Sequence, residues 1–350
     1  MQDYQAGQAQ RWRKTMALLS VSLVILFVVS LGIGSVSIPI GDIINVLTGG
    51  AASKKTWTNI IINFRLPKSI TALLVGAGLS VSGLQMQTFF RNPLAGPFVL
   101  GISSGASLGV ALAIMAGVSL GIVSSALSSW YLVIAATLGA SLVLLLVVAV
   151  SIRIKDSMSL LIIGLMFGSV TGAVVSVLQY FSSAQNIQAY LVWTFGSLGG
   201  MNPQELMIFI PVVLAGILIA FVLAKSLNAL LLGENYAQSM GLNINSVRLW
   251  VILSTSLLAG GITAFTGPIA FIGIAVPHLS RMLFNTSDHR LLIPLTCLVG
   301  AILMLVCDMI AQVPGSEHLL PINAITSMFG APVVIWLILR KKNLRSSFGA

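Results

Sequence analysis

Charged residues are scarce in this sequence, and their scarcity limits the kind of protein it can encode. Only 7% of the 350 residues are charged and 57% are hydrophobic, whereas an average soluble domain is about 25% charged and roughly 45–50% apolar. A water-soluble fold cannot bury so much apolar surface. The apolar residues fall in runs that match the roughly 20 residues of helix needed to cross a bilayer core of about 30 Å. We therefore expect an all-α, polytopic membrane protein.

Cysteine and histidine are also scarce, with two and three residues respectively. Both cysteines, Cys297 and Cys307, lie inside one apolar run, so they are expected to pack as small apolar side chains and not to form a disulfide framework. His278 and His289 flank one short link, and His318 lies in a loop expected on the other side of the membrane. A metal site needs three or four converging ligands, so no bound metal is expected.

Catalytic and nucleotide-binding signatures are missing as well. The sequence has no G-x-x-x-x-G-K-[ST] motif, so the chain is not expected to cradle ATP phosphates or to be an enzyme with a cofactor of its own. No Ser/His/Asp set or carboxylate pair that would indicate an intramembrane hydrolase is visible in the apolar runs. Asp308 lies within one run, where an ionisable group is a functional candidate by default. We favour a structural or gating role for Asp308 and leave a proton-relay role open.

The apolar runs, bounded by charge, proline or glycine, predict ten membrane spans in one transmembrane domain covering residues 1–350. An even number of spans places both termini on the same side of the membrane. The first span is expected to be a signal anchor, because its apolar run exceeds the length of a cleaved signal peptide. The expected limits are 15–36, 66–90, 97–117, 130–152, 158–181, 204–224, 248–266, 268–285, 290–311 and 321–339.

Lysine and arginine are distributed unequally between the two sides. With the termini inside, fourteen of the 18 basic residues fall on the inner side and four on the outer side, a bias that places both termini in the cytoplasm. The basic residues form no long continuous face, so the net charge of +10 does not indicate a nucleic-acid partner. The inner residues are Arg11, Arg13, Lys14, Arg91, Arg153, Lys155, Lys225, Arg248, Arg281, Arg290, Arg340, Lys341, Lys342 and Arg345, and the outer ones are Lys54, Lys55, Arg65 and Lys68.

Two local patterns predict how helices begin and pack. Glycines recur every four residues at positions 101, 105 and 109, and again at 164, 168 and 172. Such strips let a neighbouring helix approach closely, so tight packing is expected there. Asn202, Pro203 and Glu205 have the spacing of a capping box, so Glu205 is expected to start a helix and not to act as a catalytic acid.

The segment "RLPKSITALLVGAGLSVSGLQMQTFFRNPLAGPFVLGISSGASLG", residues 65–109, resembles the FecCD family of ABC importer permeases, which carry iron–siderophore, haem or vitamin B12. Further matches lie in "GPIAFIGIAVPHLSRMLFNTSDHRLLIP" and "LPINAITSMFGAPVVIWLIL". The resemblance implies the fold of the vitamin B12 importer permease, a type II ABC importer, in the bacterial inner membrane. It implies a metal chelate as cargo, with a ferric siderophore favoured and haem and vitamin B12 left open.

The resemblance also implies partners. A second permease copy, identical or paralogous, would pair with this chain around a path lined by the spans at 158–181 and 321–339. Two separate ATPase subunits would use ATP, and an extracytoplasmic binding protein would deliver the cargo. The segment 225–247 resembles the family's cytoplasmic coupling loop, in which two short helices contact the ATPase. The coupling residues it implies are Glu234, Ala237, Met240, Gly241 and Leu242.

Gate and docking residues are implied in the same way. Asn92 and Leu94 match a cytoplasmic gate between two spans, where Pro93 and Pro97 are expected to stop the helices on either side. Ser157 and Met158 align with a second gate by length and polarity only.

On the outer side, Arg65 and Lys68 resemble the basic pair that grips the binding protein. The family's further docking arginine aligns with Gln312, a departure that leaves Lys54 and Lys55 as substitutes. An ion-coupled secondary transporter is the alternative from another class, and inverted repeats are compatible with both.

Overall fold

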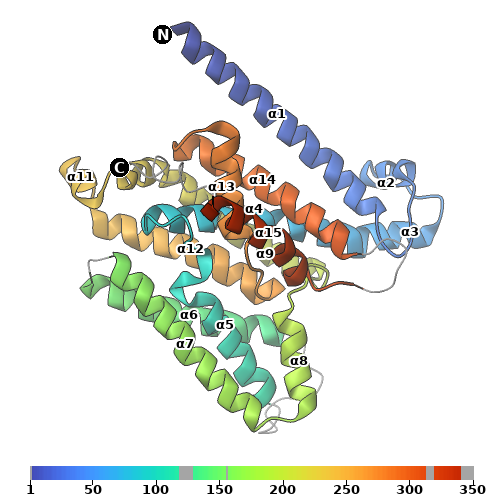
Figure 1. Cartoon of the computed structure of the whole chain (residues 1–350). Coiled ribbons are helices and arrows are strands. Elements are labelled where there is room, and N and C mark those ends of the chain that lie inside the picture. Colours follow the sequence, from blue (N-terminus) through green and yellow to red (C-terminus); the bar gives the residue numbers. More distant parts are fainter. Residues whose placement is uncertain (1, 118–128, 155–156, 313–318, 340–350) are drawn as a thin grey trace.

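The computed structural model describes residues 2–117, 129–154, 157–312 and 319–339, and within these ranges all regular structure is helical (Figure 1). The expectation of an all-α protein is confirmed for these residues. The α-helices are α1 (Gln2–Gly32), α2 (Ile40–Leu47), α3 (Lys55–Ile60), α4 (Leu66–Phe89), α5 (Ile102–Ala111), α6 (Ser129–Arg153), α7 (Ser157–Tyr180), α8 (Ala184–Thr194), α9 (Pro203–Val222), α10 (Ala224–Leu231), α11 (Glu234–Ser239), α12 (Ile244–Thr266), α13 (Ile272–Phe284), α14 (His289–Ala311) and α15 (Ile322–Leu339). Two π-helical stretches (Ile61–Arg65 and Leu112–Gly117) and one 3₁₀ turn (Pro97–Leu100) join them.

Every one of the expected spans contains helix, but their lengths differ from the prediction. In the described residues, seven helices are long and apolar enough to cross a membrane, and three apolar helices are shorter, at Ile102–Gly117, Ile272–Phe284 and Ile322–Trp336. The first of these is not α-helical throughout, because α5 is preceded by a 3₁₀ turn and continues into a π-helical stretch. Ten full membrane crossings are therefore not established by helix length.

The shortening of α13 has a local cause. The span expected from residue 268 becomes helical only at Ile272, and its 13 residues extend about 20 Å at 1.5 Å each, less than a bilayer core. Gly267 has a positive φ of 72°, and Pro268 lacks an N–H to continue a helix. The Asn323 side chain accepts a hydrogen bond from the Ala270 N–H at 3.1 Å, which satisfies part of this irregular backbone inside the protein.

Helix α4 is the centre of the bundle. Of its most apolar window, 89% is buried inside the protein, whereas only 11% of the corresponding window of α1 is buried. Helices α9, α12, α13 and α14 pack around α4 and share one apolar core with it. A second core joins α5, α6, α7 and α12 on the other side (Figure 1). Because α12 contributes to both cores, it connects the two halves of the molecule.

Glycine pairs allow the helices around α4 to approach closely. The Gly83 backbone lies against that of Gly273 on α13, and Gly76 lies against Gly300 on α14, so that a Cβ at any of them would meet backbone atoms. The predicted strip on α5 is confirmed, because Gly105 packs against Gly139. The strip on α7 is only partly confirmed: a Cβ at position 172 would meet nothing within 4 Å.

The capping box that begins α9 is also confirmed. The Asn202 side chain accepts from the Glu205 N–H at 2.9 Å, and the Glu205 carboxylate accepts from the Asn202 N–H at 3.0 Å. Glu205 is buried, and both contacts satisfy amide groups that the first turn of a helix leaves free. The carboxylate therefore has a structural role at the start of this helix.

The substitution Gly83→Ala tests the close approach of α4. We expect it to lower the thermal stability of the purified chain in nanodiscs, because a methyl group overlapping fixed backbone costs about 1–3 kcal/mol or more. Gly172→Ala is the matched control, since the same methyl group enters open space there. Equal melting temperatures for the two variants would contradict the packing described here.

Candidate functional site

The residues singled out from the sequence gather at opposite ends of the bundle. Helix α11 and the first part of α1 lie toward one end, and α2 and α3 toward the other (Figure 1). We call the first the Arg91 end, because the turn after α4 lies there, and the second the Lys68 end, after a residue in the first turn of α4.

The turn that follows α4 is held by its own backbone. The Asn92 N–H donates to the Gln87 carbonyl and the Arg91 N–H to the Thr88 carbonyl, at 3.1 and 3.2 Å, the paired bonds of a Schellman motif. The Asn92 side chain then accepts a hydrogen bond from the Leu94 N–H at 2.9 Å and so satisfies a backbone group that the helix end leaves free. Leu94 is exposed. The turn is therefore held by hydrogen bonds within the segment, and α4 ends before it, as expected from Pro93.

Arg91 occupies an unusual conformation in this turn. Its φ of 45° lies in the left-handed region, which glycine most often fills at this position of a Schellman motif. Its guanidinium reaches α10, where Nη2 donates to the Leu230 carbonyl at 3.4 Å. The turn thereby contacts the segment that leads into α11.

The second predicted gate lies at the start of α7. Ser157 is the first residue of that helix, and its side chain lies outside the described part of the structure. Met158 is 55% exposed and extends from the first turn. On the other side of the link, the Ile154 carbonyl accepts a hydrogen bond from Arg248 Nη1 at 3.1 Å. The chain directly after α6 is therefore tied to the N-terminal part of α12.

The segment 225–247 forms the short helices α10 and α11 before α12 begins. Ala237 is fully buried against the protein, whereas Met240 is 61% exposed. Gly241 has a φ of 84° and closes α11 in a Schellman motif, with the Leu242 N–H donating to the Ala237 carbonyl at 3.1 Å. Glu234 starts the helix and lies 3.6 Å from Arg248 Nη2.

An exposed apolar stripe on this segment was not predicted. Leu232, Tyr236 and Met240 are spaced four residues apart and are all exposed. Tyr236 and Met240 share one face of α11 by this spacing, whereas Leu232 lies before the helix break at Gly233, whose φ is 119°. Helical spacing in the sequence could have paired Tyr236 with Met240, but it could not tell which face points outward. Of the predicted coupling residues, only Met240 belongs to the stripe.

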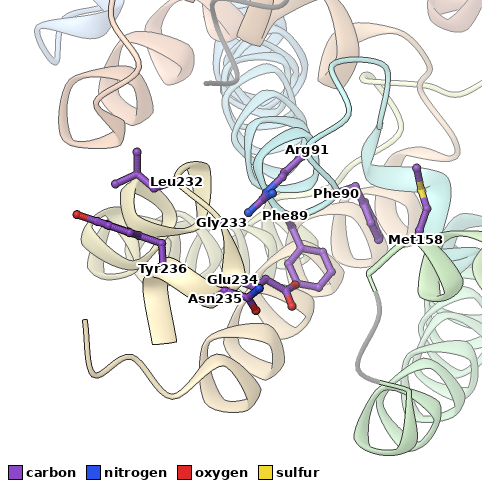
Figure 2. Close-up of a pocket in the computed structure, with 9 residues that line it drawn as sticks. All are labelled: Phe89, Phe90, Arg91, Met158, Leu232, Gly233, Glu234, Asn235 and Tyr236. Carbon is purple, nitrogen blue, oxygen red and sulfur yellow. The ribbon is translucent and has the colours of Figure 1, made fainter. Parts of the chain in front are cut away.

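A cleft lies between the end of α4, the start of α7 and the α10–α11 segment (Figure 2). It has a volume of about 580 Å³. Phe89, Phe90 and Arg91 line it from the end of α4, and Met158 lines it from α7. The remaining lining residues all come from the α10–α11 segment and are Leu232, Gly233, Glu234, Asn235 and Tyr236. The predicted gate residues Asn92 and Leu94 follow the lining residue Arg91 in sequence but do not line the cleft themselves.

Behind the cleft, a buried polar network joins α4, α10 and α14. His289 lies between Thr88 and Asn228, with ring nitrogens 2.8 Å from the Thr88 hydroxyl and 2.7 Å from the Asn228 Oδ1. Asn228 donates to Asp288 at 2.6 Å. Burial tends to raise the pKa of Asp288, but hydrogen bonds from Asn228 and the Arg290 backbone outweigh it, so the pKa lies below its ordinary value. The network holds the end of α4 and α10 in register.

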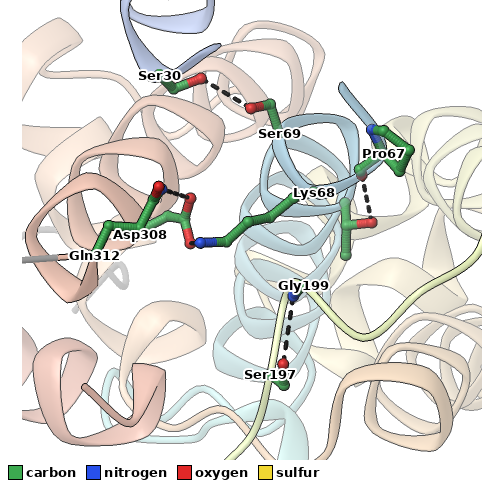
Figure 3. Close-up of polar contacts among 9 residues, drawn as sticks. Ser30, Pro67, Lys68, Ser69, Ser197, Gly199, Asp308 and Gln312 are labelled. Carbon is green, nitrogen blue, oxygen red and sulfur yellow. Dashed lines mark hydrogen bonds and ion pairs between the residues drawn. The ribbon is translucent and has the colours of Figure 1, made fainter. Parts of the chain in front are cut away.

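At the Lys68 end, a buried ion pair joins α4 to α14 (Figure 3). Lys68 Nζ lies 3.0 Å from an Asp308 carboxylate oxygen, and the Gln312 amide donates to the other oxygen at 2.9 Å. Gln312, at the position where the family pattern has a docking arginine, thus provides a hydrogen-bond donor for the second carboxylate oxygen of Asp308. The structural-partner interpretation of Asp308 is supported by this geometry.

Arg65 is also engaged inside the chain. Its guanidinium donates to the Leu31 carbonyl at 2.6 Å and to the Val36 carbonyl, so it fastens the end of α1 to the start of α4. The two lysines of the preceding loop are exposed instead, and Lys54 lies over the Trp57 ring at 4.8 Å. In the isolated chain, therefore, the outward-facing cations at this end are the loop lysines.

Substitutions at Lys68 and Asp308 test the strength of this ion pair. Lys68→Met leaves the Asp308 carboxylate buried without its cation, and we expect a loss of about 3–5 kcal/mol in stability. The double variant Lys68→Met with Asp308→Asn should recover much of that loss, as measured by thermal unfolding of the chain in nanodiscs. Additive effects of the two substitutions would contradict the pairing.

The sequence and the fold are similar to those of known transport proteins. The model of the FecCD transport family matches residues 22–340. The hemin transport system permease protein HmuU of Yersinia pestis is 35% identical over 335 residues, covering 95% of this chain and 98% of HmuU. The vitamin B12 import system permease protein BtuC of Klebsiella pneumoniae is 33% identical, covering 96% of each chain.

A solved structure is similar throughout its length. It is described as an inward-facing conformation of a metal-chelate type ABC transporter, and it superposes with a TM-score of 0.82 at 33% identity. The similarity covers 94% of this chain and 99% of that one. With the family model and the relatives both matching nearly end to end, the chain belongs to the FecCD transport family.

Proposed function

We propose that this chain is the membrane-spanning permease subunit of an ABC importer for a metal chelate. Its relatives carry hemin and vitamin B12, and its structural neighbour is a metal-chelate type transporter. The observation that carries the proposal is the cleft at the Arg91 end, which the proposed coupling segment lines together with Met158 and with Arg91, the residue before Asn92. That arrangement would let an attached ATPase act on the path for the cargo.

The Arg91 end is proposed to face the cytoplasm. The sequence distribution of lysine and arginine supports this orientation through the positive-inside rule. Of the fourteen basic residues assigned to the inner side, Lys155, Arg340, Lys341, Lys342 and Arg345 lie outside the described part of the structure. The bacterial inner membrane, with both termini in the cytoplasm, is the proposed location.

Two ATPase subunits are the proposed partners on the cytoplasmic side. The exposed side chains of Leu232, Tyr236 and Met240 offer one of these subunits an apolar contact beside the cleft, and the second permease copy would offer the same contact to the other. Ala237 supports the stripe from beneath, and Gly241 ends it. ATP would be bound and hydrolysed by those subunits, and this chain would undergo conformational change without covalent chemistry.

A second permease copy is the proposed partner within the membrane. Helix α7 has only 22% of its apolar window buried, and its exposed apolar side chains include Ile162, Met166 and Val170. Two copies, identical or paralogous, would cover such faces and enclose a path between them. Helices α7 and α15 are the proposed lining.

A substrate-binding protein is proposed to dock at the Lys68 end, with Arg65 and Lys68 as the expected contacts. Because Lys68 is already paired with Asp308, a carboxylate of the docking protein would have to compete with that residue. Lys54 and Lys55 are exposed and available without such competition. The four cations would together favour an acidic partner surface.

The proposed cargo class is a metal chelate, with a ferric siderophore tested first and haem and cobalamin as the alternatives. A secondary transporter would need an acidic group free to take up an ion. Asp308 is held by Lys68 and Gln312, so it is poorly placed for that role. The ABC importer is the better-supported function.

The import reaction itself is the test of the proposed function. The chain would be reconstituted in proteoliposomes with the ATPase and binding protein encoded beside it, and uptake would be measured with ferric siderophore, haem or cobalamin. We expect ATP-dependent uptake of one of these chelates. Uptake driven by an ion gradient without the ATPase would contradict the proposal.

Charge placed on the apolar stripe should release the ATPase. We expect Tyr236→Asp or Met240→Asp to reduce co-purification of the ATPase about tenfold or more, because a desolvated carboxylate opposes an apolar interface. Ser239→Asp is the control, as it adds the same charge at an exposed polar site on α11. Retained ATPase in the stripe variants would show that the contact lies elsewhere.

A further inference from the structure

Arg248 makes contacts that its sequence context does not indicate. It lies in the first turns of α12, and its side chain is only 3% exposed. Nη1 donates to the Ile154 carbonyl at 3.1 Å, and Nη2 lies 3.6 Å from the Glu234 carboxylate. Ile154 ends the segment before the α6–α7 link, and Glu234 begins α11. One guanidinium therefore contacts both Ile154, shortly before the proposed second gate in sequence, and the first residue of the proposed coupling helix.

Arg91 makes the equivalent connection from the first gate. Its Nη2 reaches the Leu230 carbonyl at 3.4 Å and lies close to Gly233, at the joint between α10 and α11 (Figure 2). The backbone at Arg91 is left-handed, a conformation in which glycine is favoured over every residue with a Cβ. An arginine at this position therefore adds strain to the turn, and the side chain must contribute something that glycine would not.

The cleft explains why such contacts matter. Met158 lines it on one side and Asn235 and Tyr236 on the other, so apolar packing between the gates and α11 is interrupted there. A movement of α11 would be transmitted poorly across an open space. The two arginines reach around this gap, and a planar guanidinium can hold a carbonyl and a carboxylate simultaneously where a lysine ammonium has no such fork.

We infer that Arg248 and Arg91 are positioning residues that connect the α10–α11 segment to the two gates, one arginine to each gate. The inference rests on the proposed function, since it assigns how that permease couples ATP hydrolysis to transport. Arg248 makes Ile154, after α6, move together with Glu234 of α11. Arg91 makes the turn after α4 move together with the end of α10. Loss of either contact should leave the ATPase attached and active while transport per ATP falls.

Arg91→Gly gives the cleanest test, because glycine fits the left-handed turn and removes only the side chain. In proteoliposomes containing the complete importer, we expect chelate transported per ATP hydrolysed to fall about tenfold, the effect of losing one hydrogen bond to a charged group. Thermal stability should be equal to that of the wild type or higher. A wild-type ratio of transport to hydrolysis in Arg91→Gly would overturn the role of Arg91.

Arg248→Gln tests the second connection. Its matched control is Arg153→Gln, which removes an exposed arginine from the end of α6, next to Ile154. We expect the transport ratio to fall about tenfold in Arg248→Gln and to stay at the wild-type value in the control. Arg248→Lys, which can hold one partner but not both, should give an intermediate ratio, and it serves as the main test where the glutamine variant fails to fold.

A purely structural role for Arg248 would give another pattern. The yield of the assembled importer and its transport rate would then fall in proportion, with the ratio of transport to hydrolysis unchanged, and that result would overturn the inference. Adding Glu234→Gln to Arg248→Gln should lower the ratio no further, because both act through one contact. Failure of wild-type transport itself would count against the proposed function and not against this connection.

Discussion

The close approach of backbones around α4 is the constraint on which the rest of the structure depends. In a membrane there is little hydrophobic force between helices, so tight van der Waals packing through small residues has to hold them together. Gly83 against Gly273 and Gly76 against Gly300 bring α13 and α14 directly onto α4. Because these contacts hold α4 along its length, they also fix the positions of its two ends, where Lys68 and the Arg91 turn lie.

Polar interactions are concentrated at those two ends. At the Lys68 end, the ion pair with Asp308 joins α4 to α14. At the Arg91 end, the Thr88, His289 and Asn228 network ties α4 to α10 and α14, next to the cleft. Buried polar groups of this kind are costly unless they are satisfied, and satisfied networks specify one arrangement. Packing and polar contacts therefore hold both ends of α4, whereas at the cleft α4 and the α10–α11 segment are joined by the hydrogen bond from Arg91 to Leu230.

Much of this organisation could be predicted from the sequence, and the failures have physical causes. The all-α class followed from the length of the apolar runs, and the capping box at Asn202 and the turn at Asn92 followed from local rules of capping and helix termination. The start of α13 did not, because an apolar run does not reveal that the Asn323 side chain, 53 residues away, satisfies an unwound stretch at Ala270. Similarly, positive-inside counting assigned Arg91 and Arg248 to the inner side but could not identify the carbonyls they contact, because Leu230 and Ile154 are distant in sequence.

If the α10–α11 segment acts on the gates as proposed, the cleft at the Arg91 end should change width as the attached ATPase cycles. The most direct measurement places spin labels at Met158 and Tyr236, both exposed on opposite sides of the cleft, after replacement of Cys297 and Cys307. Their separation would be recorded by pulsed electron paramagnetic resonance in the complete importer, with and without ATP. We expect the distance distribution between the two labels to differ between the ATP-bound and the ATP-free importer. Identical distributions in an importer that still transports its chelate would contradict this expectation.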